Sequence, residues 1–251
     1  MRDLLFAAML GVAALPAAAC RMTMALEQWP PYVYRDAQDR YTGLDLELLQ
    51  AIFKEARCIL VTLPELPTAR RELLFQQGKL DLMLAASETP ERLSYARFSV
   101  AYRDEAVGLF SKPGNAAGQR PAASFAQLAR GKATLLAPKV GWYGAQYAAA
   151  RPMLEQAGRL NAFGSFQQGV RMLDAGRADL LMGDVLAVRH EARLQGVALT
   201  ALPFFVLRAP VHLMLNARST SAADLARLNA AITRLEQHGA LAAIRARYDA
   251  P

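Results

Sequence analysis

Hydrophobic and polar positions along this chain follow two periods in turn, and each period predicts one kind of element. Residues 22–26 alternate apolar and polar side chains, as a half-buried strand does, whereas residues 44–56 repeat apolar side chains at helical spacing. The pattern then predicts a strand over 59–63, a helix over 69–77 and a strand over 80–85. The last run is almost wholly apolar, which is typical of a strand in a parallel sheet.

The second half of the chain shows the same alternation of strands and helices. Ser165 is expected to cap a helix that ends at Gly176, because its hydroxyl can accept an unpaired backbone N–H. The other predicted helices cover residues 143–157, 185–194, 222–235 and 240–248. The predicted strands cover residues 133–137, 178–182, 197–202 and 211–215. Strands that alternate with helices predict an α/β fold.

A short sequence echo divides this pattern into two similar parts. The segment Gly78–Leu84 (GKLDLML) matches the segment Gly176–Met182 (GRADLLM), and each is expected to run from a helix end into a buried strand. One copy in each half predicts two α/β lobes, although two such turns can also resemble each other by chance. Ligands of open α/β sheets bind beyond the carboxyl ends of strands, so residues 86–92 and 183–184 are candidates for a site.

The N-terminal residues have the features of a secretory signal rather than of a membrane span. Arg2 precedes an apolar run over 4–15, and the alanines at 17–19 supply the small residues of a signal-peptidase site. We therefore expect residues 1–19 to be removed and the mature protein to be periplasmic and soluble. The apolar stretch 197–215 contains two prolines and an arginine, so we expect buried strands there.

The two cysteines, Cys20 and Cys58, stand at the starts of the first two predicted strands. An even number of cysteines in an oxidising compartment favours a disulfide, and adjacent strands can bring such starts within bridging distance. Two alternatives are Cys20 as a lipid-anchored N-terminus and a pair of free thiols. Ala17 differs from the leucine that usually stands three residues before a lipidated cysteine, which favours the bridge.

Composition and charge narrow the classes of function. Apolar residues make up 53% of the chain and charged residues 20%, so the chain can fill a core and is not of the disordered class. The formal charge of +7 comes from scattered arginines without a basic run, which favours a solvated surface over a nucleic-acid interface. The histidines lack metal-ligand spacing, and neither a G-x-S-x-G elbow nor a glycine-rich phosphate loop occurs. We therefore expect no metal and no cofactor.

The residues after the first copy of the echo carry chemistry suited to a carboxylate. Thr89 is expected to cap a helix whose first residue is Pro90, where unpaired N–H groups attract anions. Arg92 adds a guanidinium fork that fits a carboxylate in a bidentate manner. The alternative is an ordinary capped helix with a solvated arginine.

Other candidates follow the second copy and the first strand. Asp184 is placed to bind an ammonium group, to cap a helix that begins at Val185, or to do both. Trp29, Tyr32 and Tyr34 follow the first predicted strand and can wall a pocket, although they can equally belong to the core or its rim. A site with both kinds of charge suits a zwitterion.

Several segments, in order along the chain, resemble the bacterial extracellular solute-binding proteins of the polar-amino-acid type, which serve ABC importers. They are Trp29–Tyr32, Thr42–Leu48, Gly78–Met83, Thr89–Arg92, Phe98–Tyr102, Gly176–Asp179 with Asp184, and Leu228–Ile232. The resemblance covers nearly all of the mature chain. The positions of Cys20 and Cys58 also resemble a subgroup with a bridge between the first two strands.

The resemblance implies a periplasmic-binding-protein-like fold of two α/β lobes, joined by a two-segment hinge that closes on a ligand. It places the first lobe at 20–110 and 210–251, and the second lobe at 111–209. The two crossings are expected near 108–114 and 204–210.

The resemblance also implies a role for each site residue. The arginine matching Arg92 grips the ligand carboxylate, with help from the residues matching Ser87 and Thr89. The aspartate matching Asp184 holds the amine, and the aromatic residues matching Trp29 and Tyr32 pack on the ligand side chain.

This chain departs from the family where the second-lobe helix is expected to begin. Gly141-Trp142-Tyr143 stands where the family usually has a small hydroxyl residue. Trp142 and Tyr143 are therefore expected to narrow the pocket or to stack on a planar ligand.

The resemblance favours a monomeric periplasmic protein that binds an amino acid or a related zwitterion, has no enzymatic activity and delivers its ligand to the permease of an ABC importer. Two alternatives use the same scaffold: an enzyme similar to the periplasmic cyclohexadienyl dehydratases, and a sensor that feeds no transporter. The enzyme would need a general acid near the cleft, for which Glu88 and Glu105 are candidates. Turnover of prephenate or arogenate would favour the enzyme.

Overall fold

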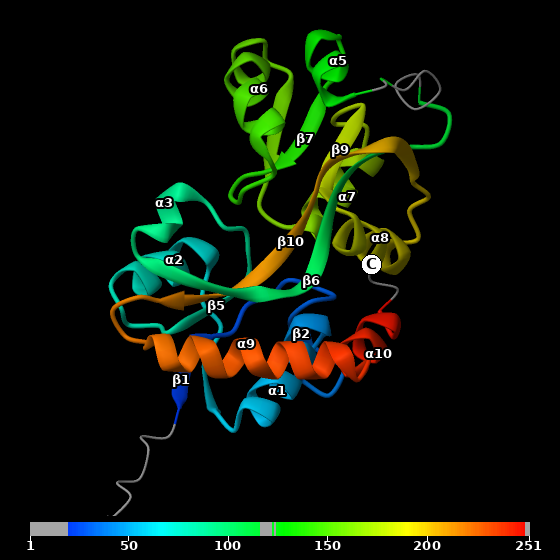
Figure 1. Ribbon diagram of the computed structural model, residues 1–251. Coiled ribbons are helices and arrows are strands. Elements are labelled where there is room, and N and C mark those ends of the chain that lie inside the picture. Colours follow the sequence, from blue (N-terminus) through cyan, green and yellow to red (C-terminus); the bar gives the residue numbers. More distant parts are fainter. Residues whose placement is uncertain (1–19, 116–121, 123, 249–251) are drawn as a thin grey trace, which may run out of the picture.

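The computed structural model describes residues 20–115, 122 and 124–248, which form two lobes, one above the other in Figure 1. The first lobe holds β1 (Arg21–Ala25), β2 (Tyr34–Arg35), β3 (Tyr41–Thr42), β4 (Ile59–Leu63), β5 (Leu82–Ala86), α1 (Leu44–Ala56), α2 (Thr68–Gln76), α3 (Pro90–Leu93), α9 (Ala222–Gln237) and α10 (Ala240–Ala246). The second lobe holds β7 (Leu135–Pro138), β8 (Leu160–Phe163), β9 (Leu180–Asp184), α5 (Phe125–Arg130), α6 (Ala145–Gln156), α7 (Phe166–Asp174) and α8 (Val185–Gln195).

Two long antiparallel strands, β6 (Ala96–Ser111) and β10 (Thr200–Asn216), run from one lobe into the other (Figure 1). They lie inside a six-stranded sheet with the order β5-β10-β6-β9-β7-β8, so a first-lobe strand and a second-lobe strand flank the pair. The predicted crossings, 108–114 and 204–210, fall on these strands or directly after β6. The exact lobe boundaries stay a prediction.

The structure corrects three expectations about strands. β6 was not predicted as a long strand, and the two strands expected at 197–202 and 211–215 form one continuous β10 with shifts in its pairing register. From the sequence alone, the prolines inside β10 argue against one continuous strand, because proline cannot donate a ladder hydrogen bond. β5 pairs antiparallel with β10 rather than in a parallel sheet, whereas β1 and β4 are parallel.

The two copies of the sequence echo have the same local structure. Asp81 accepts the backbone N–H of Thr23 on β1 at 2.8 Å. Asp179 accepts the backbone N–H of Thr134, directly before β7, also at 2.8 Å. Each aspartate therefore joins the start of its own strand to a neighbouring segment, which gives both copies a structural reason for the shared residues.

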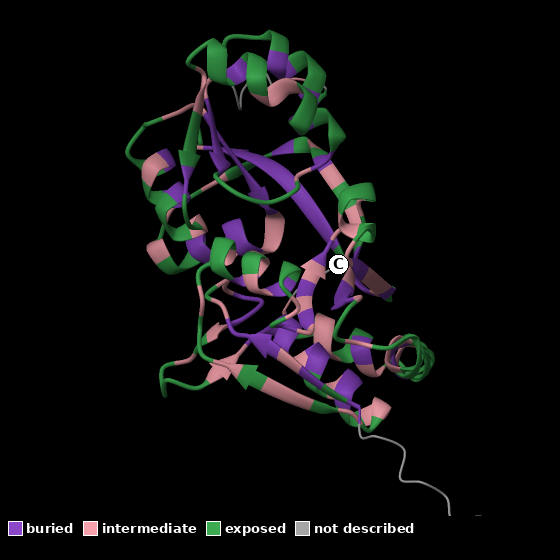
Figure 2. Cartoon of the chain, turned by 90° about the vertical axis from the view of Figure 1, so that its left-hand side faces the viewer, coloured by how far each residue is buried: buried purple, intermediate pink, exposed green. Residues whose placement is uncertain are grey.

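The core and the disulfide hold the first strands in place. Buried residues lie inside both lobes (Figure 2). Helix α1 has the predicted bounds, and its buried residues are mostly apolar. Cys20 and Cys58 form the predicted disulfide, next to the paired residues Arg21 and Ile59. Both thiols are bonded to each other, so the structure favours the bridge over a lipid-anchored Cys20 and over free thiols.

The signal peptide expected at 1–19 lies outside the described residues. Along the described chain, no helix is both long and apolar enough to cross a membrane.

Gly43 fixes the path of the chain between β1 and α1. Its φ is 121°, and a Cβ atom there would lie 2.4 Å from the carbonyl oxygen of Tyr32, so only glycine fits. The N–H groups of Leu44 and Asp45 donate to the carbonyl oxygens of Pro31 and Tyr32 at 2.9 and 3.0 Å. The start of α1 therefore holds Tyr32 and Asp45 beside each other, at the base of the site described below.

Candidate functional site

A cavity of about 540 Å³ lies between the lobes, within the size range of small-molecule sites. The residues after β1, helix α2 and the end of β5 line it from the first lobe, and the loop from β7 to α6 and the start of α7 line it from the second. Its polar and aromatic lining includes Glu27, Trp29, Arg71, Ser87, Arg92, Glu105, Trp142, Tyr143 and Glu191. The cavity therefore lies beyond the carboxyl ends of strands, where the sequence predicted a site.

Arg92 and Ser87 give one part of the cavity the chemistry that suits a carboxylate. Thr89 caps α3 as predicted, and its hydroxyl accepts the backbone N–H of Arg92 at 3.3 Å. The Arg92 guanidinium donates from Nη1 to the carbonyl oxygen of Ser87 at 2.9 Å, which is its one hydrogen bond within the described chain. Most of its N–H donors are therefore available to a ligand or to water.

The aromatic residues on the cavity come from both lobes. Trp29 from the first lobe and Trp142 and Tyr143 from the second line the same space. Trp142 is 41% exposed, whereas Tyr143 is half-buried. The expectation that Trp142 opens a helix is wrong, because Gly144, with a φ of 92°, is the N-cap and α6 begins at Ala145.

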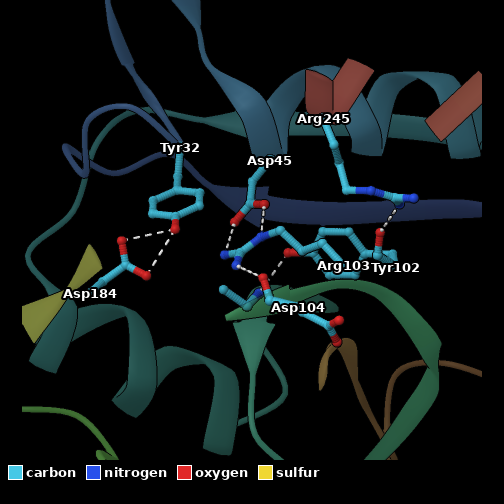
Figure 3. A network of polar contacts seen from close by, with 8 residues as sticks. Tyr32, Asp45, Tyr102, Arg103, Asp104, Asp184 and Arg245 are labelled. Carbon is cyan, nitrogen blue, oxygen red and sulfur yellow. Dashed lines mark hydrogen bonds and ion pairs between the residues drawn. The ribbon is translucent and has the colours of Figure 1, made fainter. Parts of the chain in front are cut away.

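Behind the cavity, buried polar residues form a network (Figure 3). Arg103 on β6 donates to both carboxylate oxygens of Asp45, from Nε at 2.6 Å and from Nη2 at 2.9 Å. The Tyr32 hydroxyl lies 2.9 Å from each carboxylate oxygen of Asp184, at the end of β9. The Arg103 guanidinium carbon lies 4.2 Å from the centre of the Tyr32 ring. These contacts join the first-lobe loop after β1 to the second lobe through side chains that are at most 4% exposed.

Some predicted site residues do not line this cavity. They are Tyr32, Tyr34, Thr89 and Asp184. Thr89 lines a neighbouring cavity of about 250 Å³, which also touches Arg92 and Trp142. Tyr32 and Asp184 are turned into the network instead, because each satisfies a polar group of the other. Their expected contacts with a ligand stay predictions.

Asp184 has the structural role that the sequence offered as an alternative. Its Oδ1 atom accepts the backbone N–H of Ala187 at 2.8 Å, so it caps α8. Burial raises the pKa of Asp184 to about 6, although this N–H, the charge of Arg103 and the Tyr32 hydroxyl favour the ionised form.

Glu105 on β6 is the buried carboxyl group that faces the cavity without a partner. It is 8% exposed, and it accepts no hydrogen bond from the described residues. Burial raises the pKa of Glu105 to about 8, and the nearby charge of Asp184 acts in the same direction. Glu88, the other candidate general acid, is exposed and does not line the cavity.

An ion pair on the first-lobe wall was missed by sequence reasoning. Arg71 on α2 donates through both terminal nitrogens to the two oxygens of Glu27, with 2.8 Å from Nη1 to Oε1. Burial raises the pKa of Glu27, and the charge of Arg71 opposes this shift. Glu27 lies two residues beyond β1, so the rule about strand ends points to it, whereas no sequence signal marks Arg71. Across the described residues, no cluster of acidic, histidine or cysteine side chains is arranged to hold a metal ion.

Solved structures share this fold. A histidine kinase sensor domain with similarity to periplasmic binding proteins matches with a TM-score of 0.74 and 17% identity, over 92% of this chain and 96% of that chain. A substrate-binding protein of a Streptococcus pneumoniae ABC uptake transporter, solved with bound histidine, matches with a TM-score of 0.74 and 18% identity, over 91% of this chain and 92% of that chain. An ancestral amino acid-binding protein, a precursor of cyclohexadienyl dehydratase, matches with a TM-score of 0.72 and 20% identity, over 92% of this chain and 94% of that chain. At such identities the likeness shows the fold alone.

The sequence itself places the chain in a family. No curated protein matches it. The family model of the bacterial extracellular solute-binding proteins, family 3, matches residues 22–250, which include both walls of the cavity and the network behind it. The chain therefore belongs to the bacterial extracellular solute-binding proteins of family 3.

Proposed function

We propose that this protein binds an amino acid or a related zwitterion between its lobes and delivers it to the permease of an ABC importer, without chemical conversion. Membership of an extracellular solute-binding family supports a binding role outside the cytoplasm. The observation that carries the proposal is the half-buried Arg92, whose guanidinium makes one hydrogen bond within the described chain and lines the cavity between the lobes. A ligand carboxylate would complete its partners.

Ligand binding is expected to close the lobes. A solute in the cavity touches residues of both lobes, so it binds the closed arrangement more tightly than an open one. The walls would then close around β6 and β10, the strands that both lobes share. Trp29 and Trp142 face the cavity from opposite lobes, so their fluorescence should report this closure.

A second function is favoured by one observation. Glu105 lines the cavity, and its pKa of about 8 keeps its carboxyl group protonated at neutral pH, as a general acid requires. An enzyme on this scaffold, similar to the cyclohexadienyl dehydratases, could use that proton. Turnover of prephenate or arogenate by the purified protein would decide for this function and against simple binding.

A thermal-shift screen with amino acids tests the leading proposal. A ligand at one hundred times its dissociation constant should stabilise the protein by about 2.7 kcal/mol. For each amino acid that binds, the matched control is its carboxamide, which keeps the amine and the side chain but lacks the carboxylate. We expect the carboxamide to bind at least roughly tenfold more weakly, because Arg92 loses a charged partner. The proposal is wrong if no amino acid stabilises the protein, or if amides and acids bind equally.

A further inference from the structure

We infer that the carboxylate of Glu105, and not that of Asp184, receives the ammonium group of the ligand. The inference rests on the proposed function, because it names the protein partner of one group of a zwitterion bound in the same cavity. It departs from the role that family resemblance implies for Asp184, and three features of the structure support it.

The first feature is that the Asp184 carboxylate already has its partners. Both of its oxygens lie 2.9 Å from the Tyr32 hydroxyl, and Oδ1 also accepts the N–H of Ala187 at 2.8 Å. Asp184 is 1% exposed and does not line the cavity. An ammonium group in the cavity would have to enter this buried network to reach it, and displacement of Tyr32 would leave a buried hydroxyl without an acceptor.

The Tyr32 side chain is also packed against two neighbouring side chains. Its ring centre lies 4.3 Å from that of Trp29 and 4.2 Å from the guanidinium carbon of Arg103. The backbone carbonyl of Tyr32 is fixed by the N–H of Asp45. Displacement of the hydroxyl would therefore disturb packing as well as a hydrogen bond.

The second feature is that Glu105 has the opposite environment. It lines the cavity, is 8% exposed and accepts no hydrogen bond from the described residues. Because Glu105 lines the cavity and has no donor within the described chain, a ligand in the cavity can supply donors that the chain does not. Glu105 pairs with Ala209 on β10, so it lies on the strands shared by both lobes and is available to a ligand that spans them.

The third feature is the balance of charge around Glu105. The titratable groups that face it are Arg103 on its own strand, Asp184 on β9, Asp45 on α1, Tyr32 after β1 and Tyr143 before α6. The one cation among them, Arg103, is already paired with Asp45 through two hydrogen bonds. The remaining surroundings are negative or neutral, so they favour a positively charged ligand group beside Glu105.

Proton release is the measurable consequence. Burial and the charge of Asp184 raise the pKa of Glu105 to about 8, so the group is mostly protonated in the ligand-free protein at pH 7. The ligand arrives as R–NH3⁺, Glu105 changes from –COOH to –COO⁻, and one proton passes to solvent. Affinity should therefore rise with pH, by at least roughly tenfold from pH 6 to pH 8.

Isothermal titration calorimetry tests the inference. Amino acids that stabilise the protein in the thermal-shift screen are titrated at pH 6, 7 and 8, in two buffers with different ionisation enthalpies that together count the protons released. The proteins are the wild type, Glu105→Gln, Asp184→Asn, and Glu88→Gln as the control for an exposed glutamate outside the cavity. The wild type and Glu88→Gln should release close to one proton per ligand at pH 7.

Glu105→Gln should release no proton, should bind at least roughly tenfold more weakly at pH 8, and should lose the dependence of affinity on pH. Asp184→Asn should retain part of the proton release and part of the pH dependence, because burial still raises the pKa of Glu105 after the charge of Asp184 is removed. The inference is overturned if Glu105→Gln keeps the proton release and the pH dependence, or if Asp184→Asn alone removes them. If no amino acid binds the wild type, the proposed function fails together with the inference, which is a different result.

Discussion

Two neighbouring regions of the molecule each hold an arginine and a carboxyl group, and they differ in whether these groups have partners within the chain. In the network behind the cavity, Arg103 binds both oxygens of Asp45, and Asp184 accepts from a hydroxyl and a backbone N–H. In the cavity, Arg92 makes one hydrogen bond and Glu105 accepts none from the described residues. The first region is complete within the folded chain, whereas the second leaves donors and acceptors available to a ligand or to water.

The comparison separates structural from functional charges without reference to residue type. Each region contains an arginine and a carboxyl group, so composition cannot tell them apart. Their hydrogen-bond partners can, because the groups of the network are satisfied by the chain itself, whereas those of the cavity leave hydrogen-bonding capacity open to a ligand. We therefore assign the network to stability and the cavity to binding.

The largest expected effect is on stability, from Arg103→Met. This substitution leaves Asp45 as a buried carboxylate without its cation, which typically costs about 3–5 kcal/mol. The free energy of unfolding, measured with urea, should fall by this amount. The double variant Arg103→Met with Asp45→Asn should recover part of the loss, because it removes the unpaired charge. A loss below about 1 kcal/mol for Arg103→Met would show that the network does not stabilise the fold.

The matched substitution in the cavity, Arg92→Met, should have the opposite pattern. Binding of a carboxylate ligand should weaken by about 2–3 kcal/mol, in the lower part of the range for truncated charge pairs, because Arg92 is half-exposed. The free energy of unfolding without ligand should change by no more than about 0.5 kcal/mol. Calorimetry and urea unfolding on the same protein check both values, and a stability loss as large as that of Arg103→Met would remove the distinction between the regions.

An effect that is spread over several pH units is expected on the pH dependence of stability. The pKa of Glu105 is about 8 in the folded protein and 4.5 ordinarily, so between these values the folded state retains a proton that the unfolded state releases. Stability should therefore fall as pH rises from about 5 to 8, by at most about 1.4 kcal/mol per pH unit from this group. Glu105→Gln should lack the fall in stability that comes from Glu105, and Glu88→Gln should retain it. Unfolding curves without ligand at pH 5 to 8 measure the difference, and parallel slopes for the wild type and Glu105→Gln would refute it.

Much of the fold was predictable from local pattern. The bounds of α1 follow from the spacing of its apolar residues, and those of β4 follow from a run rich in β-branched residues. Both elements match the prediction. β6 was missed because Arg103, Asp104 and Glu105 interrupt its apolar residues, and its strand form depends on pairing with β10 and β9. Pairing between distant segments overrides local propensity there.

The site was predictable where a local signal marks it. Cap chemistry at Thr89 pointed to Arg92, and strand ends pointed to Trp29. The network could not be found in this way, because the two residues in each of its pairs lie 58 and 152 positions apart. Without that network, the sequence could not show that Asp184 is already satisfied.

The most direct test is the crystal structure of the protein with the amino acid that binds most tightly in the screen. The account predicts that the ligand carboxylate lies on the Arg92 guanidinium, that its ammonium group lies within hydrogen-bond distance of Glu105, and that the Tyr32 hydroxyl remains bound to Asp184. A ligand ammonium group on Asp184, with Tyr32 displaced and Glu105 still without a partner, would contradict the account.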